Sequence, residues 1–499
     1  MRPHVLTLAG LLLSCTLGAQ TPVYDHVILN GRVMDPESGV DAIRTLGIRS
    51  TSIAAMSTAP LQGRDTIDAR GLVVAPGFID MHVHWQSPAG YRFAALDGVT
   101  TALEAEGGVW PVPDWYQERA GKSLINFGAT VSHGGVRGTV VHSSGTLADA
   151  KTGQDTIVFN NPWAYQRATA EQITEIQHLI ERGLDEGALG IGLGLAYTPA
   201  AGRDEILRVF QTGAHAGVTS FVHVRHAGLT VNQGSIDAAQ EVIADAAATG
   251  AALHIVHVTS TGLRETPVVL ELIQGARQRG VDVTTELYPY EAASTDIQAA
   301  IFDPGWQARL GVKEDAILYV KTGERLTPET FQKYRRMGGP IVIFLIPKDA
   351  MYAALKAPGV MIGSDGVEII NNTGHPRGAG TYARVLGRLV RDEQVIPLMD
   401  ALRRMTLLPA RRLQAYAPAM RRKGRLKVGA DADITVFDPA TVMDRATFEQ
   451  PEQASTGIPF VLVNGVPVVR NGKVVDGVAP GIGITRVAVR PSGTTPPRR

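Results

Sequence analysis

The chain has 499 residues, of which 44% are hydrophobic and 19% are charged, a composition typical of a globular protein with a large core. Its 48 basic side chains balance 48 acidic ones, so the composition excludes a strongly basic or acidic protein. Because neither a basic stripe nor a recognition motif is present, we expect no nucleic-acid partner.

The first twenty residues, MRPHVLTLAGLLLSCTLGAQ, combine Arg2, an apolar stretch and small residues. This pattern is typical of a secretory signal peptide at 1–20 and is too short for a spanning helix. The only cysteine, Cys15, follows LLS as at a bacterial lipoprotein processing site, whereas cleavage after Ala19 would release a soluble protein. We therefore expect an exported protein, periplasmic or secreted, that contacts a membrane only through a lipid anchor at Cys15.

Strands alternate with amphipathic helices through most of the chain, with two helices expected at 170–187 and 235–250. Such alternation favours a parallel sheet, and eight candidate strands in one region favour an α/β fold of the (β/α)8 barrel type at 76–419. The stretch around 300–345 is long between strands and indicates an insertion. The eight strands are LVVAPGFIDMHVH, VTTALEAE, LINFGATVSH, ALGIGLGLAY, TSFVHVRH, ALHIVHVTS, VDVTTELYPY and VMIGSDG.

Residues able to do chemistry stand at the ends of these strands. Barrel enzymes build their sites at the C-terminal ends of the strands, where side chains from different strands converge. Because these residues stand at the C-terminal ends of their strands, we expect them to form a single site. The residues at this position are His82, His84, Glu104, Glu106, His133, Tyr197, His223, His257, Tyr288 and Asp365.

The histidines and carboxylates of this set predict a zinc site. His82 and His84 lie on one strand face because strand side chains alternate, and with Asp365 they offer one metal an N, N, O ligand set. His223 and His257, with a carboxylate from the second strand, would bind a second metal or complete the first. Imidazole and carboxylate ligands suit Zn²⁺, so one or two zinc ions are expected.

Four further assignments concern carboxylates and one histidine. Glu106 is nearer the strand end than Glu104, so we expect it to be the metal or bridging ligand with Glu104 behind it; the reverse order is the alternative. Asp365 is the expected proton shuttle, because a carboxylate beside a metal-activated water can pass its proton to a leaving nitrogen. His133 either contacts substrate or is an ordinary core histidine.

The motifs PGFIDMHVH and IGSDG, with two single histidines on later strands, resemble the amidohydrolase superfamily of metal-dependent barrel hydrolases. Within it, GVTT at 98–101, YPYEAAST and HPRGAGTYARVLGR resemble the N-acyl-D-amino-acid deacylases (D-aminoacylase-like). The resemblance covers residues 24 to 485. It implies a small β-sandwich domain built from 21–75 plus 420–490, which leaves 491–499 as a flexible tail.

The resemblance also implies roles for individual residues. His82, His84 and Asp365 match one metal group of the family, and His223 and His257 match the other. A second set falls where the family holds the substrate carboxylate: Tyr197, Tyr288, Ser294 and Arg377. Phenol and hydroxyl donors with a guanidinium suit a carboxylate.

Two departures from the family pattern concern the site. The family typically has a cysteine at the end of the second strand, where this chain has Glu106, and often a lysine two residues after the sixth-strand histidine, where it has Thr259. A bridging carboxylate keeps the metal chemistry feasible. Loss of the lysine removes one contact with a substrate carboxylate. A carboxylated lysine, as in hydantoinase-like relatives, is not expected because no lysine stands at a barrel-strand end.

The sequence thus predicts a zinc-dependent amidohydrolase. We expect it to cleave an acyl amide bond of a small carboxylate-bearing substrate, such as an N-acyl-D-amino acid, by metal-activated water with Asp365 as proton shuttle. One alternative is a cyclic amidase of the hydantoinase or lactam-opening type, or a dipeptidase, on the same barrel. A non-enzymatic periplasmic scaffold is the other. The acyl group, the side-chain preference and the oligomeric state stay open.

Overall fold

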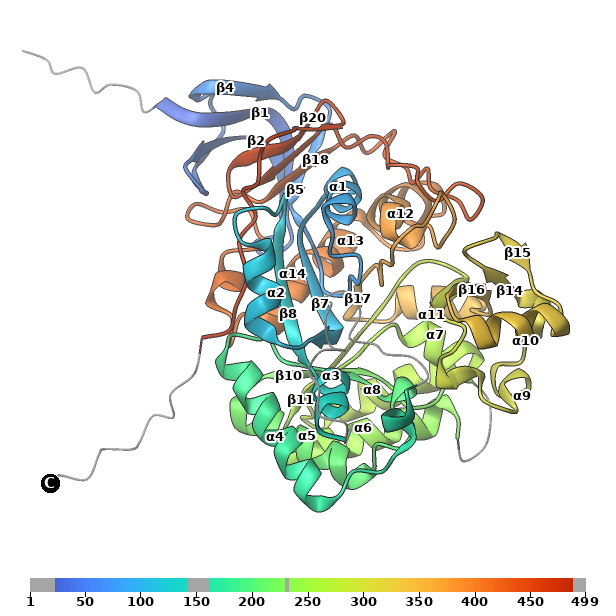
Figure 1. Cartoon of the computed structure of the whole chain (residues 1–499). Coiled ribbons are helices and arrows are strands. Elements are labelled where there is room, and N and C mark those ends of the chain that lie inside the picture. The colour runs from blue at the N-terminus through green and yellow to red at the C-terminus, as the bar shows by residue number, and fades with distance from the viewer. Residues whose placement is uncertain (1–22, 142–160, 229–232, 488–499) are drawn as a thin grey trace, which may run out of the picture.

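Eight parallel strands form a near-closed barrel, seen in the computed structural model in Figure 1. They are the eight strands expected from the sequence, so the predicted barrel is confirmed. Beyond the first strand, Val83 bridges Gly366, whose carbonyl accepts bonds from the amides of His84 and Trp85 at 2.8 and 2.9 Å. The strand order is β17 (Val360–Ile362), β12 (Val283–Leu287), β11 (Ala252–Ile255), β10 (Thr219–His223), β9 (Ile191–Gly194), β8 (Asn126–Ser132), β7 (Val99–Val109) and β6 (Phe78–Asp80).

The structure describes residues 23–141, 161–228 and 233–487. The expected signal peptide, with Cys15, and the tail at 491–499 lie outside these ranges, so both stay predictions. In the described part of the chain, no helix is long and apolar enough to cross a membrane.

The barrel strands are almost wholly buried because helices cover the sheet from outside. All eleven residues of β7 and all seven of β8 are buried. Both helices expected from the sequence are present: Thr169 caps the first through a capping box with Gln172, and the second ends at Gly250, whose φ of 73° suits glycine. The helices after the strands are α1 (Pro88–Leu96), α2 (Val112–Arg119), α3 (His133–Val141), α4 (Ala170–Asp185), α5 (Arg203–Ala216), α6 (Ser235–Thr249), α7 (Val258–Gly262), α8 (Thr266–Gln278), α11 (Lys348–Lys356), α12 (Arg377–Arg384), α13 (Leu398–Met405) and α14 (Leu407–Leu413).

A nine-stranded sheet combines both ends of the described chain, and Figure 1 shows its blue and red strands side by side. Its longest strand, β1 (Val23–Asp35), pairs with β4 from Val23 to Leu29 and with β5 at Arg32 and Val33. Its register with β2 shifts between Ile28 and Gly31. These strands enclose a separate apolar core. The other members are β2 (Val40–Arg49), β3 (Ser52–Ser57), β4 (Gln62–Asp68), β5 (Val73–Pro76), β18 (Ile434–Phe437), β19 (Phe460–Val463), β20 (Val466–Arg470) and β21 (Lys473–Val474).

A small α/β unit follows β12 before the last barrel strand and appears in yellow beside the barrel in Figure 1. We call residues 292–344 the insertion subdomain. Its sheet begins at Ala292, earlier than the expected start near 300, because the strand before Asp296 pairs with the strand that ends at Phe344. The sheet order is β13 (Ala292–Asp296), β16 (Pro340–Phe344), β14 (Ile317–Tyr319) and β15 (Glu324–Arg325), with α9 (Trp306–Leu310) and α10 (Pro328–Met337) packed beside it.

Candidate metal centre

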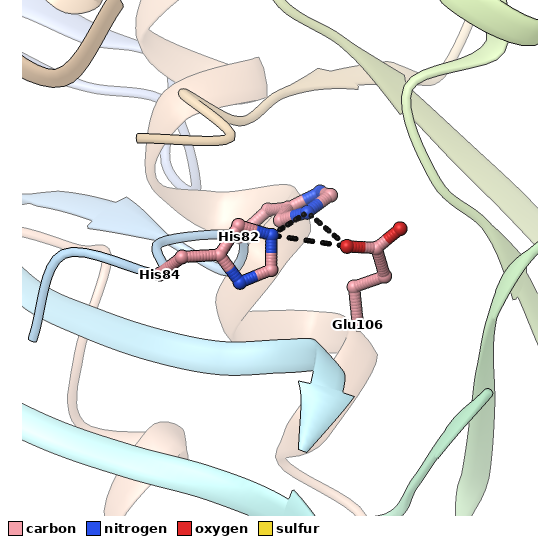
Figure 2. A group of neighbouring side chains, drawn as sticks. All are labelled: His82, His84 and Glu106. Carbon is pink, nitrogen blue, oxygen red and sulfur yellow. Dashed lines mark hydrogen bonds and ion pairs between the residues drawn. The ribbon is translucent and has the colours of Figure 1, made fainter. Parts of the chain in front are cut away.

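The carboxylate of Glu106 lies between two pairs of histidines. Its Oε2 atom is 3.2 Å from Nε2 of His82 and 3.0 Å from Nε2 of His84. Dashed lines mark both contacts in Figure 2. Its Oε1 atom is 2.5 Å from Nδ1 of His223 and 3.2 Å from Nε2 of His257. One carboxylate from β7 therefore joins side chains that come from the ends of three other strands.

Asp365 completes one side of this cluster. Its Oδ1 atom lies 3.5 Å from Nε2 of His82, 3.4 Å from Nε2 of His84 and 2.9 Å from Nη2 of Arg377. Asp365 and His257 have positive φ values, 50° and 29°. Residues other than glycine adopt such angles at a cost, and they concentrate at functional sites where the surroundings impose them. The local backbone thus turns both side chains towards the cluster.

The donor atoms suit divalent metal ions. Three groups have ligand atoms within 4.8 Å of one another: His82, His84 and Glu106; His82, His257 and Asp365; Glu106, His223 and His257. Nitrogens of neighbouring imidazoles face each other at 3.2 Å in the first pair and 3.1 Å in the second. Nitrogen and carboxylate donors that converge in this way fit zinc. The cluster is a candidate binuclear metal site.

Three of the four histidines also contact a neighbouring side chain through their Nδ1 atoms. Nδ1 of His82 lies 2.6 Å from Oε1 of Glu286, and Nδ1 of His84 lies 2.8 Å from Oε2 of Glu104. Nδ1 of His257 lies 2.9 Å from the hydroxyl oxygen of Ser260. A carboxylate at Nδ1 fixes the proton there and leaves Nε2 free to bind a metal, the usual arrangement behind metal-bound histidines.

The charges in the cluster stabilise one another. Burial opposes ionisation of His82, but the carboxylates of Asp365 and Glu106 raise its pKa well above the ordinary value. Burial likewise opposes ionisation of Glu106, whose pKa is held well below its usual range by His223 and His82. This buried site therefore favours ionised carboxylates with positive charge beside them, which two divalent ions would also supply.

A cavity of about 310 Å³ opens beside the cluster, and three of the predicted substrate-binding residues line it: Tyr197, Tyr288 and Ser294. The ring of Tyr197 is 4.9 Å from that of His223, centroid to centroid. Ser294 donates its hydroxyl hydrogen to the carbonyl of Ile341 at 2.8 Å. Arg377 lies behind the lining, where its guanidinium stacks 4.6 Å from the ring of Tyr288 and pairs with Asp365.

His133 is not brought to the cavity. It begins α3, and its Nε2 lies 2.8 Å from Oε1 of Glu205, which also accepts a bond from Nε of Arg137 at 2.9 Å. All three side chains are buried. His133 therefore lies in a buried network with Glu205 and Arg137 and is not among the residues that line the cavity.

Glu286 and Ser260, which contact Nδ1 of His82 and of His257, were not predicted from the sequence. Glu286 is two residues before Tyr288, so both point to one face of β12, and that spacing was an available signal. Ser260 is three residues after His257, in the short helix α7. A serine at that distance is too common for its sequence position to indicate a role.

Comparison with known proteins agrees with this geometry. The amidohydrolase family profile matches residues 65–469. N-acyl-D-glutamate deacylase and D-aminoacylase, both of Alcaligenes xylosoxydans xylosoxydans, are each 30% identical to this chain and cover 89% of it, with 93% and 94% of their own lengths aligned.

Solved structures show the same likeness. N-acyl-D-glutamate deacylase from Bordetella bronchiseptica, solved with zinc and a phosphonate mimic of the tetrahedral intermediate, has a TM-score of 0.77 at 26% identity. A D-aminoacylase with a binuclear metal centre has a TM-score of 0.78 at 26% identity. Each alignment covers 93% of this chain and all of the other. The chain therefore belongs to the amidohydrolase family, as a metal-dependent amidohydrolase that acts on C–N bonds and resembles D-aminoacylase.

Proposed function

We propose that this protein is a zinc-dependent deacylase that hydrolyses the acyl amide bond of an N-acyl-D-amino acid or a related carboxylate-bearing amide. The observation that carries this proposal is the position of Glu106 between two histidine pairs, with Asp365 at one side of the cluster. The names of the relatives, N-acyl-D-glutamate deacylase and D-aminoacylase, support the choice of substrate.

His82, His84 and Asp365 would hold one zinc ion, His223 and His257 the other, and Glu106 would bridge them. When bound, zinc would polarise the substrate carbonyl and lower the pKa of water. The outer contacts of the histidines matter for this role, because Glu286 and Glu104 keep the Nε2 atoms turned inwards. The protein thus supplies pre-oriented donors around the reacting bond.

Asp365 would move the proton. Burial alone would raise the pKa of its carboxyl group, but Arg377 and His82 hold that pKa well below the usual range. The group therefore starts as a carboxylate, which can accept a proton from the attacking water. It would then donate that proton to the amide nitrogen as the C–N bond breaks.

Arg377 carries buried donors just behind the cavity lining, beside the ring of Tyr288. Its Nη2 atom is engaged by Asp365, while Nε and Nη1 are buried without a hydrogen-bond partner among the described residues. Buried donors are rarely left unpaired, so these atoms favour an anionic ligand. Arg377 would take over the role of the lysine that is replaced by Thr259 in this chain.

A substrate panel on zinc-reconstituted enzyme tests the proposal. The panel contains N-acetyl-D-amino acids, their L-enantiomers, linear dipeptides, hydantoins and cyclic dipeptides, with release of free amine as the readout. We expect turnover of N-acetyl-D-amino acids above the other classes. Turnover of hydantoins or cyclic dipeptides alone would instead favour the cyclic amidase, and turnover of dipeptides alone the dipeptidase.

A further inference from the structure

His375 and Arg377 stand two residues apart where α12 begins, and both contact β13 of the insertion subdomain. Nε2 of His375 lies 2.8 Å from the carbonyl oxygen of Ala292, and Nη2 of Arg377 lies 3.5 Å from that of Ser294. Ala292 and Ser294 are also two residues apart, so their carbonyls lie on the same side of the strand. Because β13 is the edge strand of its sheet, the segment that carries Arg377 is joined to the edge of the insertion subdomain.

His375 also satisfies the first amide of α12. The first amides of a helix have no partner within it, and Pro376, the residue before Arg377, makes no capping bond to them. Instead, the Arg377 amide donates to Nδ1 of His375 at 3.1 Å. The two bonds of the imidazole require a hydrogen on Nε2 and a lone pair on Nδ1, which the neutral ring provides in one tautomer. Burial and the charge of Arg377 lower the pKa of His375 well below its usual range, which favours this neutral form.

Aromatic rings surround the imidazole. The ring centroids of Tyr290 and Phe448 each lie 5.1 Å from that of His375, and the centroid of Tyr288 lies 6.1 Å from it. The His375 side chain is fully buried among them. Tyr288 also lies against the guanidinium of Arg377, at 4.6 Å. These contacts restrict rotation of the imidazole, so its two hydrogen bonds have a fixed direction.

We propose that His375 is a positioning residue: anchored to β13, it holds the amide of Arg377 and thereby directs the Arg377 guanidinium toward the carboxylate of the substrate. This inference rests on the proposed function and on the role proposed there for Arg377. Nη2 of Arg377 is engaged by Asp365 at 2.9 Å, so a rotation at the start of α12 would turn the unpaired Nε and Nη1 donors away from a bound carboxylate. Pairing of a guanidinium with a carboxylate depends on such alignment. His375 thus acts through Arg377 and not on the reacting bond.

Two substrates separate this role from general damage. N-acetyl-D-leucine and N-acetyl-D-leucinamide differ in the carboxylate, and release of acetate measures hydrolysis of the acyl amide in both. We expect the wild-type zinc enzyme to prefer the acid in kcat/KM, and His375→Leu to lower this preference about tenfold or more, because hydrogen bonds between charged groups are weakened. A structural defect would slow both reactions and leave their ratio unchanged. Zinc counted on the same preparations should be equal in both proteins.

Two polar variants show which bond of His375 matters, and their side chains can replace one bond each. Asparagine places its carbonyl oxygen near the position of Nδ1 and can accept the Arg377 amide, whereas glutamine places its amide nitrogen near the position of Nε2 and can donate to Ala292. We expect His375→Asn to keep the preference for the acid within about threefold of wild type and His375→Gln to lose it as His375→Leu does. Equal preferences in His375→Asn and His375→Gln would overturn the inference.

A double substitution tests whether the effect passes through Arg377. In an Arg377→Met background, His375→Leu should change the preference by less than about twofold, because the group that it positions is missing. Additive effects of the two substitutions would contradict the inference. Ser455→Ala is the matched control, since Ser455 donates to the Ala379 carbonyl of the same helix at 3.3 Å. We expect the wild-type preference in this variant.

The remaining outcomes distinguish this inference from the proposed function. Wild-type enzyme that prefers the acid, together with a His375→Leu variant that keeps this preference, would overturn the inference alone. Wild-type enzyme that hydrolyses acid and amide equally well would overturn it too, since Arg377 would then have no carboxylate to bind. If fully metallated wild-type enzyme hydrolysed no N-acyl amino acid, the proposed function would fall and this inference with it.

Discussion

Glu286 contacts the imidazole of His82 on the Nδ1 side: Oε1 of the glutamate lies 2.6 Å from Nδ1. The carboxylate has little room to move. Its Oε2 atom is 3.4 Å from Nε2 of His254, and a Cβ atom at Gly363 would lie 2.7 Å from Oε2. Burial opposes its ionisation, but His254 and His82 lower its pKa to about 2. Glu286 is therefore an ionised acceptor that fixes the tautomer and the ring orientation of His82.

Glu286→Gln should weaken zinc binding about 10- to 100-fold, because the amide no longer secures the proton on Nδ1 of His82. Competition with a chelating dye measures this affinity directly. Glu271→Gln, an exposed change on α8, is the control and should bind zinc normally. Gly363→Ala should weaken binding as well, since the added methyl group displaces the same carboxylate. Unchanged affinity in both Glu286→Gln and Gly363→Ala would contradict the role of Glu286.

Glu106 and Glu104 provide a matched pair of substitutions on one strand face. Glu106→Gln removes the carboxylate between the two histidine pairs, so the enzyme should retain at most one zinc ion after dialysis. Glu104→Gln changes only the group behind His84, so two ions should remain, bound more weakly. Metal counting by mass spectrometry distinguishes the variants. The reverse result would assign the bridging role to Glu104.

Asp365→Asn should lower kcat by about 10²- to 10⁴-fold, because the amide cannot accept the proton of the attacking water. The histidine pairs and Glu106 are unchanged, so we expect zinc still to be bound. Steady-state kinetics and metal analysis on the same preparation test both parts. A variant with near-normal turnover would exclude Asp365 as the proton shuttle.

The sequence predicted the barrel and the cluster because both follow from strand geometry. Parallel strands bring their C-terminal ends to one edge, so residues as distant in the chain as His82 and Asp365 meet once each strand is recognised. The short-range signals were sufficient: an apolar run for each strand, and an ionisable residue at its end.

The same geometry explains what the sequence could not predict. His133 shares the strand-end register, but it is the first residue of α3 and faces Glu205 in α5, and no periodicity indicates on which side such a residue lies. The contact between His82 and Glu286 depends on side-chain reach across the barrel between residues 204 positions apart. Strand patterns identify which residues share an edge, whereas they do not identify the pairs that touch.

The network of His133, Arg137 and Glu205 predicts a pH-dependent loss of stability. Glu205→Gln leaves the buried Arg137 guanidinium without its counter-charge, so the free energy of unfolding should fall by about 3–5 kcal/mol at neutral pH. Burial alone would raise the pKa of Glu205, but His133 and Arg137 lower it below its usual 4.5. When folding lowers the pKa of a carboxyl group, the ionised group stabilises the folded protein at pH values above its unfolded-state pKa. This stabilisation is lost as the pH falls through the folded-state pKa. Denaturant titrations should therefore show the largest difference in unfolding free energy between the wild-type protein and Glu205→Gln above pH 5, and a smaller one below pH 4.

The control is Glu175→Gln, which breaks the exposed pair with His178 and should lower the free energy of unfolding by less than about 1 kcal/mol at every pH. A uniform deficit for Glu205→Gln across this range would mean that lost packing, rather than lost charge, destabilises the variant.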